Sequence, residues 1–144
     1  MISARRIVTI FLRRGGSGEF TKTADELTSS QVAHFQDRLE GQTPLIASMR
    51  SADEWFALSD SQVVSERLGM FRRIRLNDME GVISPVGGRG FNEGKKHGGV
   101  VEVRLKDGST LPINAESGGP FVALTNVFMY LTRVNRQRQR TLTG

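Results

Sequence analysis

The sequence contains no cysteine, and it also lacks any long hydrophobic run. Without cysteine, disulfides, thiolate catalysis and cysteine metal sites are excluded, and the chain suits a reducing compartment. The longest apolar run, residues 7–12, is too short to span a bilayer. It is also shorter than the hydrophobic region of a signal peptide, and Arg13 and Arg14 follow it in place of a small-residue cleavage site. We therefore expect a cytoplasmic location.

Residues that carry chemistry are also scarce. The two histidines, His34 and His97, lie far apart in the sequence, and neither has the spacing of a zinc site. No Gly-x-Ser-x-Gly turn is present, and no serine and carboxylate accompany either histidine in a recognisable pattern. The carboxylate pairs at residues 53–54 and 78–80 are more typical of solvated turns than of acid–base catalysis. The sequence therefore predicts no enzymatic activity, no metal site and no cofactor.

Charge is spread unevenly over the 144 residues, although the net charge is only +5. Residues 1–22 and residues 119–144 each carry a net charge of +4, whereas residues 23–84 carry −4. Basic ends attract anionic surfaces such as nucleic acids or phospholipid headgroups. They also act as solvated tails that keep a protein soluble, so both interpretations stay open.

A chain of this length can bury a core within a single domain. We expect a basic leader over residues 1–22, ordered or flexible, in which residues 7–12 form either a short strand or part of a helix. The single domain then spans residues 23–140. It begins with one helix or two short ones over residues 23–40, because Thr23 and the glutamate three positions later match a capping box.

From residue 44 onward the hydrophobic pattern changes from helical to alternating, which predicts β-strands. The predicted strands lie at residues 45–49, 54–58, 62–66, 70–76 and 79–83. Polar turns separate them at short intervals, and this spacing favours an antiparallel meander. A Gly-rich loop is predicted over residues 84–99.

Residues 99–114 predict a β-hairpin whose register is decided by its apolar residues. On the first strand, Val103 shares one face with the apolar residues two positions before and after it. On the second strand, Leu111 shares one face with the apolar residue two positions after it. The two apolar faces match only if a three-residue loop over residues 106–108 pairs Val103 with Leu111 and Val101 with Ile113. Gly108 then takes the left-handed position of a bulged turn.

The last predicted element is an amphipathic helix over residues 119–138, in which Pro120 suits the first turn. Its apolar stripe consists of Phe121, Leu124, Val127, Phe128, Leu131 and Val134. Such a stripe is typical of a core-facing helix, so we expect it to cover the open side of the sheet. The predicted fold class is therefore α+β: a small antiparallel β-barrel or sandwich of about seven short strands. One or two helices precede it, and the C-terminal helix caps it.

Three groups of basic residues are candidates for binding an anion or a partner. They are Arg67, Arg73, Arg75, Arg89, Lys95, Lys96, Arg133, Arg136, Arg138 and Arg140. The first three are expected on one strand face. The next three lie in the Gly-rich loop, which lacks the spacing of a P-loop or dinucleotide motif and forms either a plain loop or an anion-binding rim. The last four also offset the helix dipole, which requires no ligand.

Two stretches give the sequence a family resemblance. Residues 55–64 (WFALSDSQVV) are similar to an aromatic, apolar, Leu-Thr-Asp-x-Arg-Val-Ile motif, and residues 74–82 (IRLNDMEGV) to Ile-Pro-Leu-x-Asp-Ile-x-x-Val. With the hairpin and the closing helix, this order resembles bacterial PH-like domains, a pleckstrin-homology-type group that includes GRAM-like modules. Gln62 and Arg75 stand where arginine and proline are usual. The resemblance implies no catalytic residues.

The resemblance implies a non-enzymatic interaction domain that contacts a protein partner or an anionic membrane surface. Phosphoinositide-binding members use basic residues in the loop between the first two strands, where this chain has Arg50 beside Asp53. One alternative is a nucleic-acid-binding protein that uses the basic termini and strand 70–76. Another is a small enzyme or carrier with the Gly-rich loop as a lid. Unpaired strand edges also allow a homo-oligomer.

Overall fold

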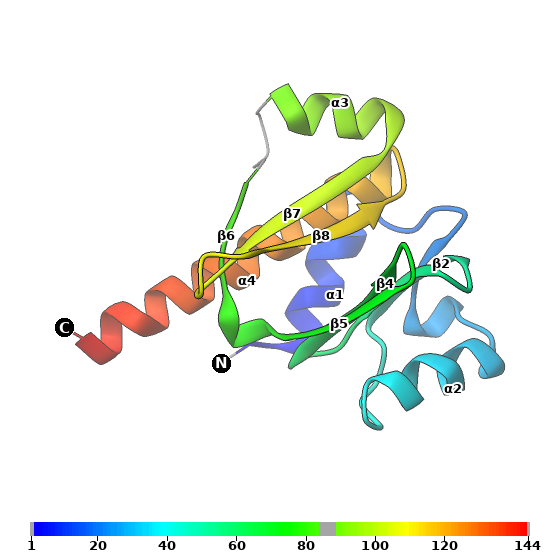
Figure 1. The fold of residues 1–144 in the computed structure, drawn as a ribbon, viewed down its shortest axis with the longest axis horizontal. Helices are drawn as coiled ribbons and strands as arrows, with labels where there is room; N and C mark the ends of the chain where they lie inside the picture. Colours follow the sequence, from blue (N-terminus) through cyan, green and yellow to red (C-terminus); the bar gives the residue numbers. More distant parts are fainter. Residues whose placement is uncertain (1, 84–88, 144) are drawn as a thin grey trace.

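The computed structural model describes residues 2–83 and 89–143 (Figure 1). Within them the helices are α1 (Ala4–Arg13), α2 (Ser29–Arg38), α3 (Arg89–His97) and α4 (Gly119–Thr143), with short 3-10 turns η1 (Ala24–Glu26) and η2 (Leu76–Asp78). The strands are β1 (Thr21–Thr23), β2 (Ile46–Ser51), β3 (Glu54–Leu58), β4 (Gln62–Arg67), β5 (Met70–Arg75), β6 (Met79–Val82), β7 (Gly99–Leu105) and β8 (Thr110–Ala115).

The strands form two antiparallel sheets. Their orders are β1-β2-β3-β4-β5 and β6-β7-β8, and no strand pairing joins the two sheets within the described residues. The predicted α+β class, the antiparallel strands and the C-terminal helix are therefore confirmed, but the sheets are open and do not close into a barrel. The predicted meander is confirmed for β2–β5. Residues 79–82 belong to the second sheet instead, because η2 turns the chain out of the first.

The predicted hairpin register is confirmed. Val103 pairs with Leu111, and Val101 pairs with Ile113. The three-residue loop closes through a hydrogen bond of 2.9 Å from the Leu105 N–H to the Ser109 carbonyl oxygen. Gly108 has a φ of 88°, which is the left-handed conformation that the bulged turn requires.

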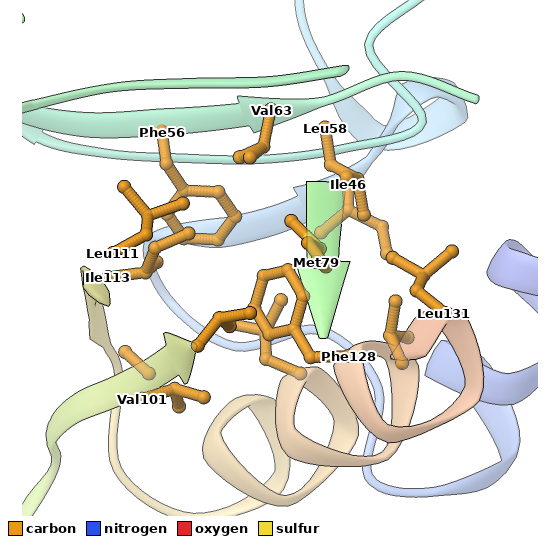
Figure 2. Close-up of a cluster of buried hydrophobic side chains, with 14 of the residues drawn as sticks. Ile46, Phe56, Leu58, Val63, Met79, Val101, Leu111, Ile113, Phe128 and Leu131 are labelled. Atoms are coloured by element: carbon orange, nitrogen blue, oxygen red, sulfur yellow. The ribbon is translucent and has the colours of Figure 1, made fainter. Parts of the chain in front are cut away.

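The main core lies between the two sheets and the helices α1 and α4. Figure 2 shows Phe56, Leu58 and Val63 from the first sheet directed toward Ile113 and Phe128 from the second sheet and α4. The predicted apolar stripe of α4 is buried from Phe121 to Leu131, and the helix runs on to Thr143, past its predicted end. A second cluster, centred on Phe35 and Trp55, packs α2 against the other face of the first sheet.

The N-terminal segment, predicted as a basic leader, contains the core helix α1. Ser3 caps this helix by accepting a hydrogen bond from the Arg6 N–H at 3.3 Å. Ile7 and Phe11 lie one turn apart and are fully buried in the main core, where α1 packs against α4. The arginines of this segment lie on its exposed side. Residues 7–12 are therefore helical, and their apolar side chains hold the segment on the domain.

The predicted Gly-rich loop is wrong over residues 89–97, which form α3, while residues 84–88 lie outside the described residues. Phe91 is buried against Phe121 of α4, with ring centroids 6.0 Å apart. A Cβ atom at Gly94 would lie 2.0 Å from the Phe121 ring, so only glycine allows this approach. Burial of these aromatic rings outweighs the cost of about 1 kcal/mol for a glycine in a helix.

Glu116, directly after β8, ties the N-terminal segment to the second sheet. Its carboxylate accepts hydrogen bonds from the backbone N–H groups of Glu19, Phe20 and Thr21 at 2.6, 2.9 and 3.0 Å. The Thr21 hydroxyl donates a fourth, also at 3.0 Å. This carboxylate thus provides the hydrogen-bond acceptor for three consecutive backbone amides, of which the last belongs to the first residue of β1.

Candidate anion-binding groove

The three arginines predicted to share one strand face do not do so. Arg67 pairs directly with Met70 across the tight β4–β5 turn, so its side chain lies on the face of Met70 and Arg72. There the Arg67 Nε donates to Asn114 Oδ1 of β8 at 3.1 Å. Arg73 and Arg75 lie on the opposite face. The prediction failed because the pairing of Arg67 with Met70 fixes which face its side chain takes.

The arginines of β5 are engaged with other parts of the protein. Arg73 donates to the Arg38 carbonyl at 2.6 Å and lies 3.6 Å from the Glu40 carboxylate. Arg75 lies 3.6 Å from the Asp78 carboxylate, and Arg72 of the opposite face donates to a β8 carbonyl at 2.8 Å. This strand therefore offers few free cations to an external phosphate.

The basic residues of the Gly-rich segment belong to α3, which lies beside the beginning of α4, while the C-terminus lies at the other end of that helix (Figure 1). Lys95 and Lys96 are exposed in the last turn of α3 and form no ion pair with a described residue. The Arg89 side chain lies outside the described residues, so the predicted anion-binding rim stays a prediction.

Two of the four arginines at the end of α4 line a groove between this helix and the second sheet. The groove has a volume of about 270 Å³. Its lining residues, called here the arginine groove, are Gly81, Val82, Arg104, Met129, Thr132, Arg133 and Arg136. Arg138 instead donates to Asn77 Oδ1 at 3.1 Å, and Arg140 is exposed on the following turn.

Helix periodicity and a β-bulge build the arginine groove. Arg133 and Arg136 share one face of α4 with Met129, because residues three and four positions apart lie above one another. From the facing sheet, Arg104 of β7 lies opposite Gly81, beside a bulge in β6. A Cβ atom at Gly81 would lie 2.9 Å from Arg104 Nη2. The absence of that Cβ therefore leaves room for the guanidinium.

The charges of Arg133 and Arg136 are not compensated by the described part of the protein. Neither side chain forms a hydrogen bond or ion pair there, and α4 contains no acidic residue. The helix dipole favours cations in the last turn of a helix, and both arginines lie before the last turn of α4. The dipole therefore does not compensate them. Like charges three positions apart destabilise a helix by about 0.2–0.5 kcal/mol. Among the three groove arginines, Arg104 alone lies near a carboxylate of the described residues, that of Glu80 at 3.9 Å.

A second exposed feature is the tip of the β4–β5 hairpin. Leu68, Met70 and Phe71 are 84%, 69% and 45% exposed. Leu68 also has a φ of 55°, a left-handed conformation that is unfavourable for a bulky side chain. The tip thus combines backbone strain with a small apolar surface.

Metal-ligand clusters and membrane-spanning helices were also sought in the described residues. No group of three or more His, Cys, Asp or Glu side chains is placed there to hold a metal ion. Among the described helices, none has an apolar stretch of the length needed to cross a membrane. Comparison with known protein families, curated proteins and solved structures gave no match to this chain. Its function is therefore argued from its own residues.

Proposed function

We propose that this chain is a non-enzymatic, PH-like interaction domain of the cytoplasm that contacts an anionic membrane surface through the arginine groove. The observation that carries the proposal is the uncompensated pair Arg133 and Arg136, which faces Arg104 across a groove of about 270 Å³. Both guanidiniums are exposed, so an anion from outside the chain can reach them.

The PH-like part of the proposal is supported by the order of elements. A four-stranded meander, β2–β5, precedes a three-stranded sheet, β6–β8, and one helix closes the chain (Figure 1). The family resemblance rests on two stretches within β3–β6, on the β7–β8 hairpin and on the closing helix, which follow one another in this order. The space between the sheets is filled with apolar side chains (Figure 2), which favours binding at the surface over catalysis inside.

The binding free energy of the membrane contact can be estimated from the number of basic residues near the bilayer. An Arg or Lys held near an anionic bilayer contributes about 1 kcal/mol, and salt weakens this contribution. Arg140 lies seven positions after Arg133, on the same side of α4, and adds to the attraction. The nucleic-acid alternative is less well supported, because the arginines of β5 that would extend a phosphate track have protein partners.

Co-sedimentation with vesicles tests the proposal. The full chain should bind phosphatidylcholine vesicles that contain phosphatidylserine and not phosphatidylcholine alone, with binding that falls across a salt series. The double variant Arg133→Gln/Arg136→Gln should bind about 30-fold more weakly, since two contributions of about 1 kcal/mol are lost. Lys95→Gln/Lys96→Gln removes the same charge at the other end of α4 and should change binding far less.

Three results would count against the proposal. Equal losses in both double variants would show that net charge alone matters. Stripping of the protein from vesicles by short duplex DNA would favour the nucleic-acid alternative. If the protein bound neither anionic vesicles nor DNA, contact with an anionic surface would be rejected and a protein partner would remain.

A protein partner is the second candidate, and the exposed hairpin tip favours it. Leu68 carries backbone strain while its side chain gains no burial in the isolated chain. The variant Leu68→Asn relieves the strain and removes the most exposed apolar side chain of the tip. Vesicle binding should be unchanged by this substitution if the arginine groove is the membrane contact. Oligomerisation through open strand edges stays a prediction.

A further inference from the structure

We infer that the arginine groove binds a phosphate monoester, and not negative charge in general. The inference rests on the proposed function and names the chemistry of its ligand. The site lies between α4 and the second sheet. It is distinct from the β2–β3 turn, to which the family resemblance would direct attention and which offers Arg50 beside Asp53.

The residue type of the groove favours phosphate. A guanidinium presents a planar fork of N–H donors that matches two oxygens of a phosphate, whereas an ammonium acts as a point charge. Three such forks, from Arg104, Arg133 and Arg136, line one groove from two sides. A phosphate monoester has three terminal oxygens to accept from them, while a carboxylate has two. No lysine lines this groove within the described residues.

The charge balance of the groove also matches this ligand. The three guanidiniums are opposed by one nearby carboxylate, that of Glu80, 3.9 Å from Arg104 Nε. Two positive charges are therefore left uncompensated. A phosphate monoester carries a charge of about −1.5 to −2 near neutral pH, whereas the phosphodiester of phosphatidylserine carries a single negative charge on its phosphate.

The walls of the groove fit a small phosphorylated group. Its volume of about 270 Å³ lies just below the range of about 300–1,000 Å³ for pockets that hold drug-sized ligands. Val82 and Met129 give it an apolar side on which the carbon atoms next to a phosphate can rest. Gly81 leaves the space that the Arg104 guanidinium occupies. These features describe a shaped recess and not a flat basic surface.

The same phosphate chemistry can come from a lipid headgroup or from a soluble metabolite. Phosphatidic acid presents a terminal phosphate at a bilayer, and glycerol 3-phosphate presents the same group in solution. The test compares binding of the full chain to vesicles that contain phosphatidic acid with binding to vesicles that contain phosphatidylserine, at matched surface charge. Calorimetric titration with glycerol 3-phosphate forms the second arm.

Phosphatidic acid vesicles should bind about tenfold more tightly than phosphatidylserine vesicles of equal charge. The variant Arg133→Lys/Arg136→Lys keeps the charge and removes the forks. It should lose most of this preference while its binding to phosphatidylserine stays close to wild type. Because both residues are exposed, these substitutions should leave the unfolding midpoint unchanged, and circular dichroism checks this.

The possible results separate the two proposals. Equal binding to the two lipids, or a lysine variant that keeps the preference, overturns the phosphate inference and leaves the proposed function intact. Failure to bind any anionic vesicle, together with failure to bind glycerol 3-phosphate, overturns both. Binding of glycerol 3-phosphate that the lysine variant loses supports the inference with a soluble ligand, and a preference confined to vesicles supports it with a lipid.

Discussion

Replacing Phe11 with alanine is expected to lower the free energy of unfolding by about 3–5 kcal/mol. The Phe11 side chain is fully buried in the main core, where α1 packs against α4. The truncation removes apolar contacts and leaves a cavity that neighbouring side chains fill only in part. Urea denaturation followed by circular dichroism measures the change.

The neighbouring Leu12 provides the control for this experiment. It lies on the same helix and is 55% exposed, so Leu12→Ala should change stability by less than about 0.5 kcal/mol. Equal and small effects of the two substitutions would show that the N-terminal segment is a separable leader. A large effect of Phe11→Ala alone would show that α1 belongs to the folding unit.

Replacing Glu116 with alanine is expected to cost about 2–3 kcal/mol, because its carboxylate accepts four hydrogen bonds and three of them come from backbone amides. Burial alone would raise the pKa of Glu116, but the hydrogen bonds from Phe20, Glu19 and Thr21 together outweigh it and lower the pKa. The ionised carboxylate is therefore the form that stabilises the fold.

The lowered pKa of Glu116 gives this contribution a defined pH dependence. Because the folded-state pKa lies below the unfolded value, the stabilisation is present above the ordinary pKa of 4.5. It is lost as the pH falls through the folded-state pKa. The difference in unfolding free energy between wild type and Glu116→Gln should therefore be largest near neutral pH and shrink on acidification.

Glu102→Gln is the control for this pH series, because the Glu102 side chain forms no hydrogen bond or ion pair with a described residue. Comparison of each variant with wild type at the same pH cancels the titration of other groups, such as Glu26, whose pKa is also lowered by hydrogen bonds from Ser17 and Thr23. A difference between wild type and Glu116→Gln that does not vary with pH would contradict the assigned role.

The parts of the fold that were predicted correctly are those in which local pattern and packing agree. Val103 and Leu111 pair as expected because only one register places both apolar strand faces on the same side. The apolar stripe of α4 likewise leaves one choice for its buried face. Helix α3 was missed because its glycines disfavour a helix, and the contact of Gly94 with Phe121 that favours one is tertiary.

The candidate site was predicted only in part. Arg133 and Arg136 stood out in the sequence as part of a basic helix end, but only the full length of α4 shows that the helix dipole does not explain them. Arg104 was missed because it lies on a hairpin strand, apart from the three groups of basic residues that stand out in the sequence. Its place in the groove depends on the bulge in β6 and on Gly81, which no local pattern indicates.

The most direct test of the arginine groove is a titration of the isotope-labelled full chain with a short-chain, water-soluble phosphatidic acid, followed by amide NMR. If phosphate binds in the arginine groove, the shifts should concentrate at Gly81, Val82, Arg104 and residues 129–136, and they should be lost in Arg133→Lys/Arg136→Lys. Shifts centred on residues 50–53 or on α3 would contradict it, because the phosphate would then bind elsewhere. Absence of any shift at saturating ligand would contradict it equally.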